Sequence, residues 1–125
     1  MIQKIRQSLV SLSVLAASAS GRLDIRDFGA VADDDLLAVE QANALAFNAT
    51  FEAVKNADPD GDREVYVPAG MTFNIMPIWF SYITNLTLTI DGTLKASKNH
   101  QDWTLDERGR AANLMDFSYV DGLKI

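Results

Sequence analysis

Residues 85–94, with the sequence NLTLTIDGTL, constrain the fold more than any other part of the chain. Apolar residues alternate with threonines in the first half of this segment, which is the period-two pattern of a β-strand with one apolar face. Asp91 and Gly92 then predict a corner, because glycine accepts a positive φ without steric cost. A hairpin at this corner would give an antiparallel sheet. A corner between two sides of a coil would instead give parallel strands that stack from successive turns of the chain.

An internal repeat favours the parallel alternative. Residues 80–88 (FSYITNLTL) align with residues 117–125 (FSYVDGLKI) at an offset of 37 residues. Residues 65–67 also align with residues 86–88 at an offset of 21, and the polar loop at 97–110 accounts for most of the difference. Repeats of this length with one strand–corner–strand unit each are typical of a solenoid. We therefore expect a mainly β fold in which the second copy stacks on the first.

One helix is expected ahead of most of the strands. Residues 36–55 carry Phe47, Phe51 and Val54 on one face, at the spacing i, i+4 and i+7. The acidic cluster at 33–35 should cap this helix, and the sequence DPDG that follows the helix should end it. Such a helix would cover the open end of a coil, whose apolar core and unpaired strand edges would otherwise be exposed. Strands are expected at residues 22–26, 64–67, 71–75, 78–80, 86–90, 93–96, 114–117 and 123–125.

The first 19 residues have the layout of a secretory signal peptide. Lys4 and Arg6 precede a short apolar core at 9–17, and small residues at 17–19 offer a cleavage site. The apolar core is too short to span a membrane. We expect a secreted, extracellular protein with one mature domain, residues 20–125, and no membrane association after cleavage. An amphipathic N-terminal helix that stays attached is the alternative.

Charge and composition narrow the classes of partner. The formal net charge is -6, and removal of two cations and no acids with the signal peptide changes it to -8. An acidic domain of this kind is not expected to bind nucleic acid, which rewards clustered Lys and Arg. The chain has no cysteine, so it has no disulfide framework. Sequons begin at Asn48 and Asn85, and Asn85 is the better candidate for glycosylation because it falls at a predicted corner.

Several motifs occur in a familiar order along the chain: DIRDFGA at 24–30, the acidic cluster, the Ala-rich helix, VYVPAG at 65–70 and IDGTLKAS at 90–97. They resemble the N-terminal part of pectin-lyase-like right-handed parallel β-helix proteins, and within these most closely the polygalacturonases of glycoside hydrolase family 28. The resemblance spans residues 24–125. It implies the first turns of a right-handed parallel β-helix with a capping helix, in an inverting glycoside hydrolase that acts on pectin or a related polysaccharide. It implies no cofactor, and a monomer when the protein is complete.

The chain departs from this family in two respects. Members usually carry Asp-Gly before the acidic pair, where this chain has Val31 and Ala32. The catalytic motifs of the family, Asn-Thr-Asp, Asp-Asp, Gly-His-Gly and Arg-Ile-Lys, have no counterpart here in a matching context. We therefore assign no catalytic, cofactor-binding or metal-binding residue, and we expect the 125 residues to be an N-terminal section that is inactive alone. A non-catalytic polysaccharide-binding or structural β-helix protein, and a polysaccharide lyase on the same scaffold, are the alternatives.

A few side chains remain as candidates for binding. Trp103, the largest apolar residue of the polar loop, is a candidate sugar contact or a cover for the coil. Trp79 lies in an apolar run and is expected in the core. His100 is expected on the surface. The acidic residues at 33–35 and 58–62 suit calcium in type, but a helix cap and a solvated turn are the preferred interpretations.

Overall fold

The computed structural model describes residues 22–58 and 63–125. The predicted signal peptide and most of the DPDG sequence lie outside the described residues. The described elements are strand β1 (Leu23–Asp24), 3-10 helix η1 (Ile25–Phe28), helix α2 (Leu37–Lys55), strands β2 (Glu64–Val67), β3 (Thr72–Ile75), β4 (Ile78–Ser81), β5 (Thr87–Ile90) and β6 (Thr93–Ala96), 3-10 helix η2 (His100–Asp102) and strand β7 (Met115–Ser118). The fold is mainly strands with one α-helix in this part of the chain. None of the helices in the described ranges combines the length and hydropathy that a membrane span requires.

Every strand pairing in the described ranges is parallel. The strands form three small sheets, with the orders β1-β2-β5, β3-β6 and β4-β7. Strands β5 and β6, on either side of Asp91 and Gly92, belong to different sheets. The hairpin is therefore excluded at this corner, and the parallel alternative is confirmed for the strands that flank it.

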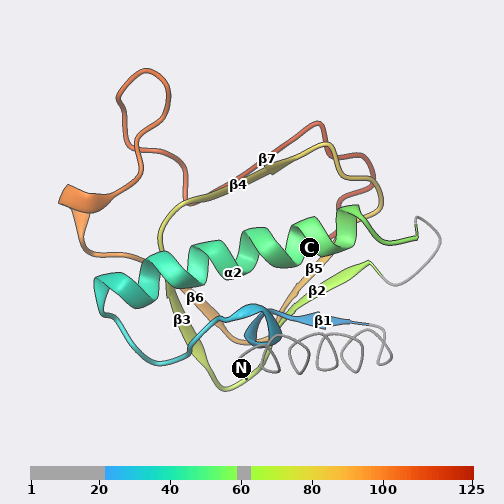
Figure 1. Cartoon of the computed structure of the whole chain (residues 1–125), viewed down its shortest axis with the longest axis horizontal. Coiled ribbons are helices and arrows are strands. Elements are labelled where there is room, and N and C mark those ends of the chain that lie inside the picture. Colours follow the sequence, from blue (N-terminus) through green and yellow to red (C-terminus); the bar gives the residue numbers. More distant parts are fainter. Residues whose placement is uncertain (1–21, 59–62) are drawn as a thin grey trace, which may run out of the picture.

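The predicted offset of 37 residues is confirmed along its whole length. Strand β4 pairs with β7 from Ile78 with Met115 to Ser81 with Ser118, and isolated bridges continue the same register from Thr84 to Asp121 and from Thr87 to Lys124 (Figure 1). The predicted alignment of residues 65–67 with 86–88 is wrong by two residues, since the structure pairs residue 65 with residue 88.

Corner length explains the error in the second alignment. Four residues separate β2 from β3, but only two separate β5 from β6. The offset therefore falls from 23 residues in the β2–β5 pair to 21 in the β3–β6 pair, where Thr72 meets Thr93. The predicted offset of 21 residues is therefore correct for the β3–β6 pair, but the sequence alignment assigned it to the β2–β5 pair.

The repeat extends to the backbone of the segments that follow β4 and β7. Tyr82 and Tyr119 both have positive φ, at 62° and 55°, and Asn85 and Gly122 do as well, at 53° and 77°. Each pair is separated by the same 37 residues. The rings of Tyr82 and Tyr119 stack with centroids 5.0 Å apart and planes 2° apart. Such a φ is uncommon for tyrosine, so the matched conformations show that both segments meet the same steric demands.

Gly92 is required for a reason other than the positive φ that the sequence predicts for this corner. Gly92 is not among the glycines with positive φ. A Cβ atom at this position would instead collide with the carbonyl oxygen of Pro68 and lie 2.6 Å from that of Met71. The close approach of the corner between β2 and β3 therefore excludes a side chain at position 92.

The predicted face of α2 forms the centre of the core. Phe47, Phe51 and Val54 are fully buried, as expected from their spacing. The ring of Phe51 contacts the rings of Phe80 on β4 and Phe117 on β7, at centroid distances of 5.5 and 5.4 Å. In Figure 1, α2 runs across the middle of the view, with β4 and β7 on one side and the other strands on the opposite side.

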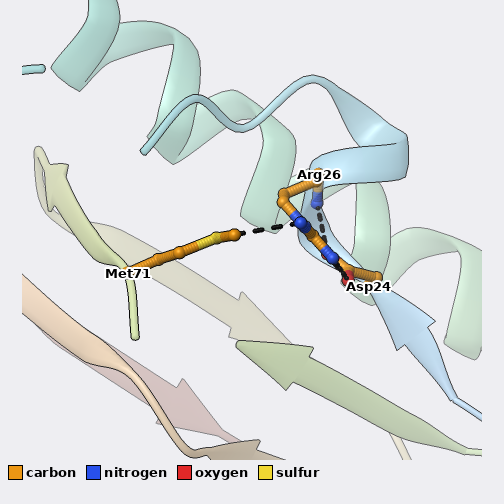
Figure 2. A network of polar contacts seen from close by, with 3 residues as sticks. All are labelled: Asp24, Arg26 and Met71. Carbon is orange, nitrogen blue, oxygen red and sulfur yellow. Dashed lines mark hydrogen bonds and ion pairs between the residues drawn. The ribbon is translucent and has the colours of Figure 1, made fainter. Parts of the chain in front are cut away.

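The first strand is shorter than predicted because a side chain diverts the backbone. Strand β1 ends at Asp24, whose Oδ1 accepts a hydrogen bond from the backbone N–H of Arg26 at 2.8 Å and so caps η1. The Arg26 guanidinium binds the same carboxylate and reaches the sulfur of Met71 at 3.8 Å (Figure 2). Gly29 then ends η1 with a φ of 107°.

Three other predictions are wrong. No strand forms at residues 123–125, where the structure has only the isolated bridge of Lys124 with Thr87. The acidic cluster does not cap α2: the N-cap residue is Leu36, which makes no side-chain cap bond, and Asp33 instead accepts the backbone N–H of Thr72. Trp79 is not in the core, since 59% of its surface is exposed. Alternation along β4 explains this, because Ile78 and Phe80 face inward and the residue between them must face outward.

Replacement of Gly92 by Ala should destabilise the protein because the new Cβ cannot be placed without moving a neighbouring backbone carbonyl. We expect a loss of about 1–3 kcal/mol in the free energy of unfolding. Chemical denaturation followed by circular dichroism measures this loss. Thr93→Ala, an exposed change at the next position, serves as the control, and an equal effect of the two substitutions would contradict the steric explanation.

Candidate functional site

A groove of about 720 Å³ lies on the outer face of β4 and β7. The strands form its floor, and residues 105–113, which belong to the connection between β6 and β7, form a wall. This connection stands away from the rest of the molecule at the upper left of Figure 1. The polar and aromatic side chains that line the groove are Trp79, Asp106, Glu107, Arg110, Asn113, Asp116 and Ser118.

The floor of the groove places an aromatic ring beside a carboxylate. Trp79 and Asp116 are direct partners in the register of β4 and β7, and both face outward. The Asp116 carboxylate accepts a hydrogen bond from the hydroxyl of Ser118 at 3.3 Å and from the side-chain amide of Asn113 at 3.4 Å. The flat ring of Trp79 is thus flanked by groups that accept and donate hydrogen bonds.

The wall of the groove is organised around Asp106. Its Oδ1 accepts the backbone N–H groups of Arg108 and Arg110, each at 2.9 Å. Its Oδ2 accepts a hydrogen bond from Nε of Arg110 at 3.1 Å and forms an ion pair with Nη2 of the same residue at 3.0 Å. The backbone N–H of Arg110 is the main cause that holds the pKa of the Asp106 carboxyl below its ordinary value. The Asp106 carboxylate therefore keeps its negative charge to lower pH than a free aspartate.

Trp103 supports the wall from behind. Its indole Nε1 donates to the carbonyl oxygen of Ala112 at 2.9 Å, its ring packs against the hydrophobic core, and His100 stacks on it with centroids 6.5 Å apart. Trp103 is not among the lining residues of the groove. These contacts agree with the covering role that the sequence left open for Trp103, and a sugar contact by this residue stays a prediction.

A buried carboxylate attaches the start of the connection between β6 and β7, which leads into the wall, to helix α2. Glu40 on α2 is 1% exposed and accepts hydrogen bonds from the Ser97 hydroxyl and the Asn99 side-chain amide, both at 2.7 Å. The exposed ion pair of Lys98 with Asp35, at 3.1 Å, adds a second link. A buried charge is costly unless it is hydrogen-bonded, so Glu40 holds these two partners in place.

Asn43, one turn further along α2, connects the helix to the segment that follows η1 and to strand β3. Its side-chain Nδ2 donates to the carbonyl oxygens of Val31 and Asn74, at 3.0 and 2.8 Å, and its Oδ1 accepts the backbone N–H of Val31 at 2.8 Å. Sequence reasoning missed both Glu40 and Asn43. A signal was present, because these polar residues fall on the same helical face as Phe47, at i, i+3 and i+7.

The other candidates do not assemble into a centre. Residues 33–35, together with Thr72, Asn74 and Lys95, line a shallow hollow of about 470 Å³. Within the described ranges, no three His, Cys, Asp or Glu side chains are grouped so that they would hold a metal ion. Asn85 is exposed at its corner, whereas Asn48 lies in α2 with a buried Oδ1 that has no hydrogen-bond partner in the described structure. Glycosylation at these two positions stays a prediction.

Sequence reasoning also missed the groove itself. It placed Trp79 in the core and treated residues 97–110 as a polar loop. The alternation at 78–80 and the 37-residue repeat, taken together, would have set Trp79 opposite Asp116 on one outward face. No known protein family, curated protein or solved structure matches the chain, so the geometry carries the functional argument.

Substitution of Glu40 tests the attachment of the wall. Glu40→Ala should leave the Ser97 hydroxyl and the Asn99 amide without their acceptor, and we expect the free energy of unfolding to fall by about 1–3 kcal/mol. Hydrogen exchange should also become faster in residues 97–113. Glu52→Ala, at an exposed position on the same helix, should change neither quantity. Unchanged exchange in the Glu40 variant would show that this carboxylate does not hold the segment.

Proposed function

We propose that the chain is the N-terminal section of a right-handed parallel β-helix protein. Parallel pairing at offsets of 21, 23 and 37 residues supports this, because each offset is the length of one turn of a coil with or without an inserted segment. The paired Tyr82 and Tyr119, with the same backbone conformation, support it as well. Helix α2 would then cover one end of the coil, as expected of a cap.

We propose further that the groove on β4 and β7 binds a polysaccharide chain. The observation that carries this proposal is the exposed Trp79 ring beside Asp116 in an open groove. Aromatic faces offer apolar contact area to the flat faces of sugar rings, and neighbouring carboxylate and amide groups can bond sugar hydroxyls.

The resemblance of the motifs extends this proposal to a class of protein. We propose a secreted glycoside hydrolase, similar to polygalacturonases, that acts on pectin or a related polysaccharide. Inverting hydrolysis needs an acid and a base on opposite sides of the scissile bond, and these carboxylates would come from residues outside this chain. The alternative is a protein that binds the polysaccharide without cleaving it, and the groove supports binding in either case.

Trp79→Ala tests the groove. We expect about tenfold weaker binding of mixed pectin oligosaccharides, which carry both free and esterified uronates, because the stacking surface is lost. Isothermal titration calorimetry measures the affinity. Tyr119→Ala removes an exposed aromatic ring that does not line the groove and should leave the affinity unchanged. Equal affinities of wild-type protein and the Trp79 variant would rule out this site.

The purified chain should release no reducing ends from pectin or polygalacturonate, since none of the catalytic motifs of the family occurs in it in a matching context. A reducing-sugar assay with an active polygalacturonase as the positive control checks this expectation. Measurable release that survives repurification would show that the 125 residues hold a complete catalytic site.

A further inference from the structure

We infer that the groove takes an uncharged stretch of sugar chain, neutral or methyl-esterified, and discriminates against free polyuronate. This inference rests on the proposed function, because it assigns a ligand class to the groove described above. The charges that line the groove, the bonds that these charges already make and the position of Asp116 beside Trp79 support it.

Acids outnumber bases in the lining of the groove. Among the described residues that line it, Asp106, Glu107 and Asp116 are acidic and Arg110 is basic. A uronate chain carries one carboxylate per residue, so each bound sugar would bring a negative charge into a negative site. Like charges brought together at an interface cost affinity, and this cost is a recognised means of rejecting a wrong ligand.

The single cation of this lining is already engaged. Arg110 uses Nε and Nη2 to bind Oδ2 of Asp106, and its backbone N–H binds Oδ1 of the same carboxylate. A ligand carboxylate that recruited this guanidinium would therefore compete with Asp106. Because the pKa of Asp106 is held low, protonation does not remove this competitor in mildly acidic solution.

The floor of the groove adds a second obstacle. A sugar ring that stacks on Trp79 lies next to Asp116, the cross-strand partner of the tryptophan. A hydroxyl group at that place can donate a hydrogen bond to the carboxylate, and a methyl ester brings no charge to it. A free uronate carboxylate would instead repel Asp116. The net charge of -6 on the whole chain acts in the same direction at longer range.

The test compares two galacturonan oligosaccharides of equal length, one fully methyl-esterified and one fully de-esterified. Calorimetric titration of the full chain at neutral pH should give an affinity for the esterified form that is at least about tenfold higher. Added salt should reduce the ratio, because it screens the repulsion of the free acid. Both titrations are repeated with calcium and with a chelator.

Substitutions then locate the discrimination. Asp116→Asn and Glu107→Gln should each raise the affinity for the de-esterified form relative to that for the esterified form, so that the ratio of the two affinities falls. Asp91→Asn removes an exposed acid that does not line the groove, and it serves as the charge-matched control. Thermal melting confirms that each variant is folded before its affinity is compared.

Each outcome decides a separate question. Equal or tighter binding of the de-esterified form, with or without calcium, overturns the inference and leaves polysaccharide binding intact. An unchanged ratio in the Asp116 and Glu107 variants overturns the assignment of discrimination to this groove. Failure of both ligands to bind overturns the proposed function, and the inference falls with it.

Discussion

The contact of Phe51 with Phe80 and Phe117 determines how the rest of the molecule is arranged. These rings join the buried face of α2 to two strands that are 37 residues apart in the sequence. They also fix which side chains of β4 and β7 point inward. Because side chains alternate along a strand, the neighbouring positions point outward. Trp79 and Asp116, one position before each phenylalanine, must then face outward together. The groove is thus a consequence of how the core is packed.

The wall of the groove depends on a different interaction, the burial of Glu40. A carboxylate that is 1% exposed requires partners, and it finds them in Ser97 and Asn99 where the connection leaves β6. Further along, the Asp106 carboxylate accepts three hydrogen bonds, forms an ion pair with Arg110 and shapes the tip of the segment. One acidic residue therefore fixes the base of the wall and another fixes its tip, and the second also contributes charge to the groove. Asp106 therefore contributes both to the shape of the wall and to the negative charge of the groove.

Much of the fold was predictable because it follows from local patterns. The helical spacing of Phe47, Phe51 and Val54 identified both α2 and its buried face. The repeat of residues 80–88 at 117–125 identified the β4–β7 register without error. The register of β2 with β5 was not predictable in the same way, because it depends on the lengths of two corners that look alike in sequence. Apolar alternation shows where a strand lies, but it does not show how many residues the corner between two strands contains.

The candidate site was less predictable, for reasons that particular residues make clear. The local patterns of this sequence determined one helix, the positions of most of the strands and the preference for parallel pairing at the Asp91 corner. Only the tertiary structure decided that Trp79 is exposed, that Gly92 is required by the nearby Pro68 carbonyl, and that Glu40 is buried against Ser97. Each of these outcomes depends on a neighbour that is distant in sequence. Local periodicity shows that a residue lies on a face, but what covers that face is decided by the packing of the whole chain.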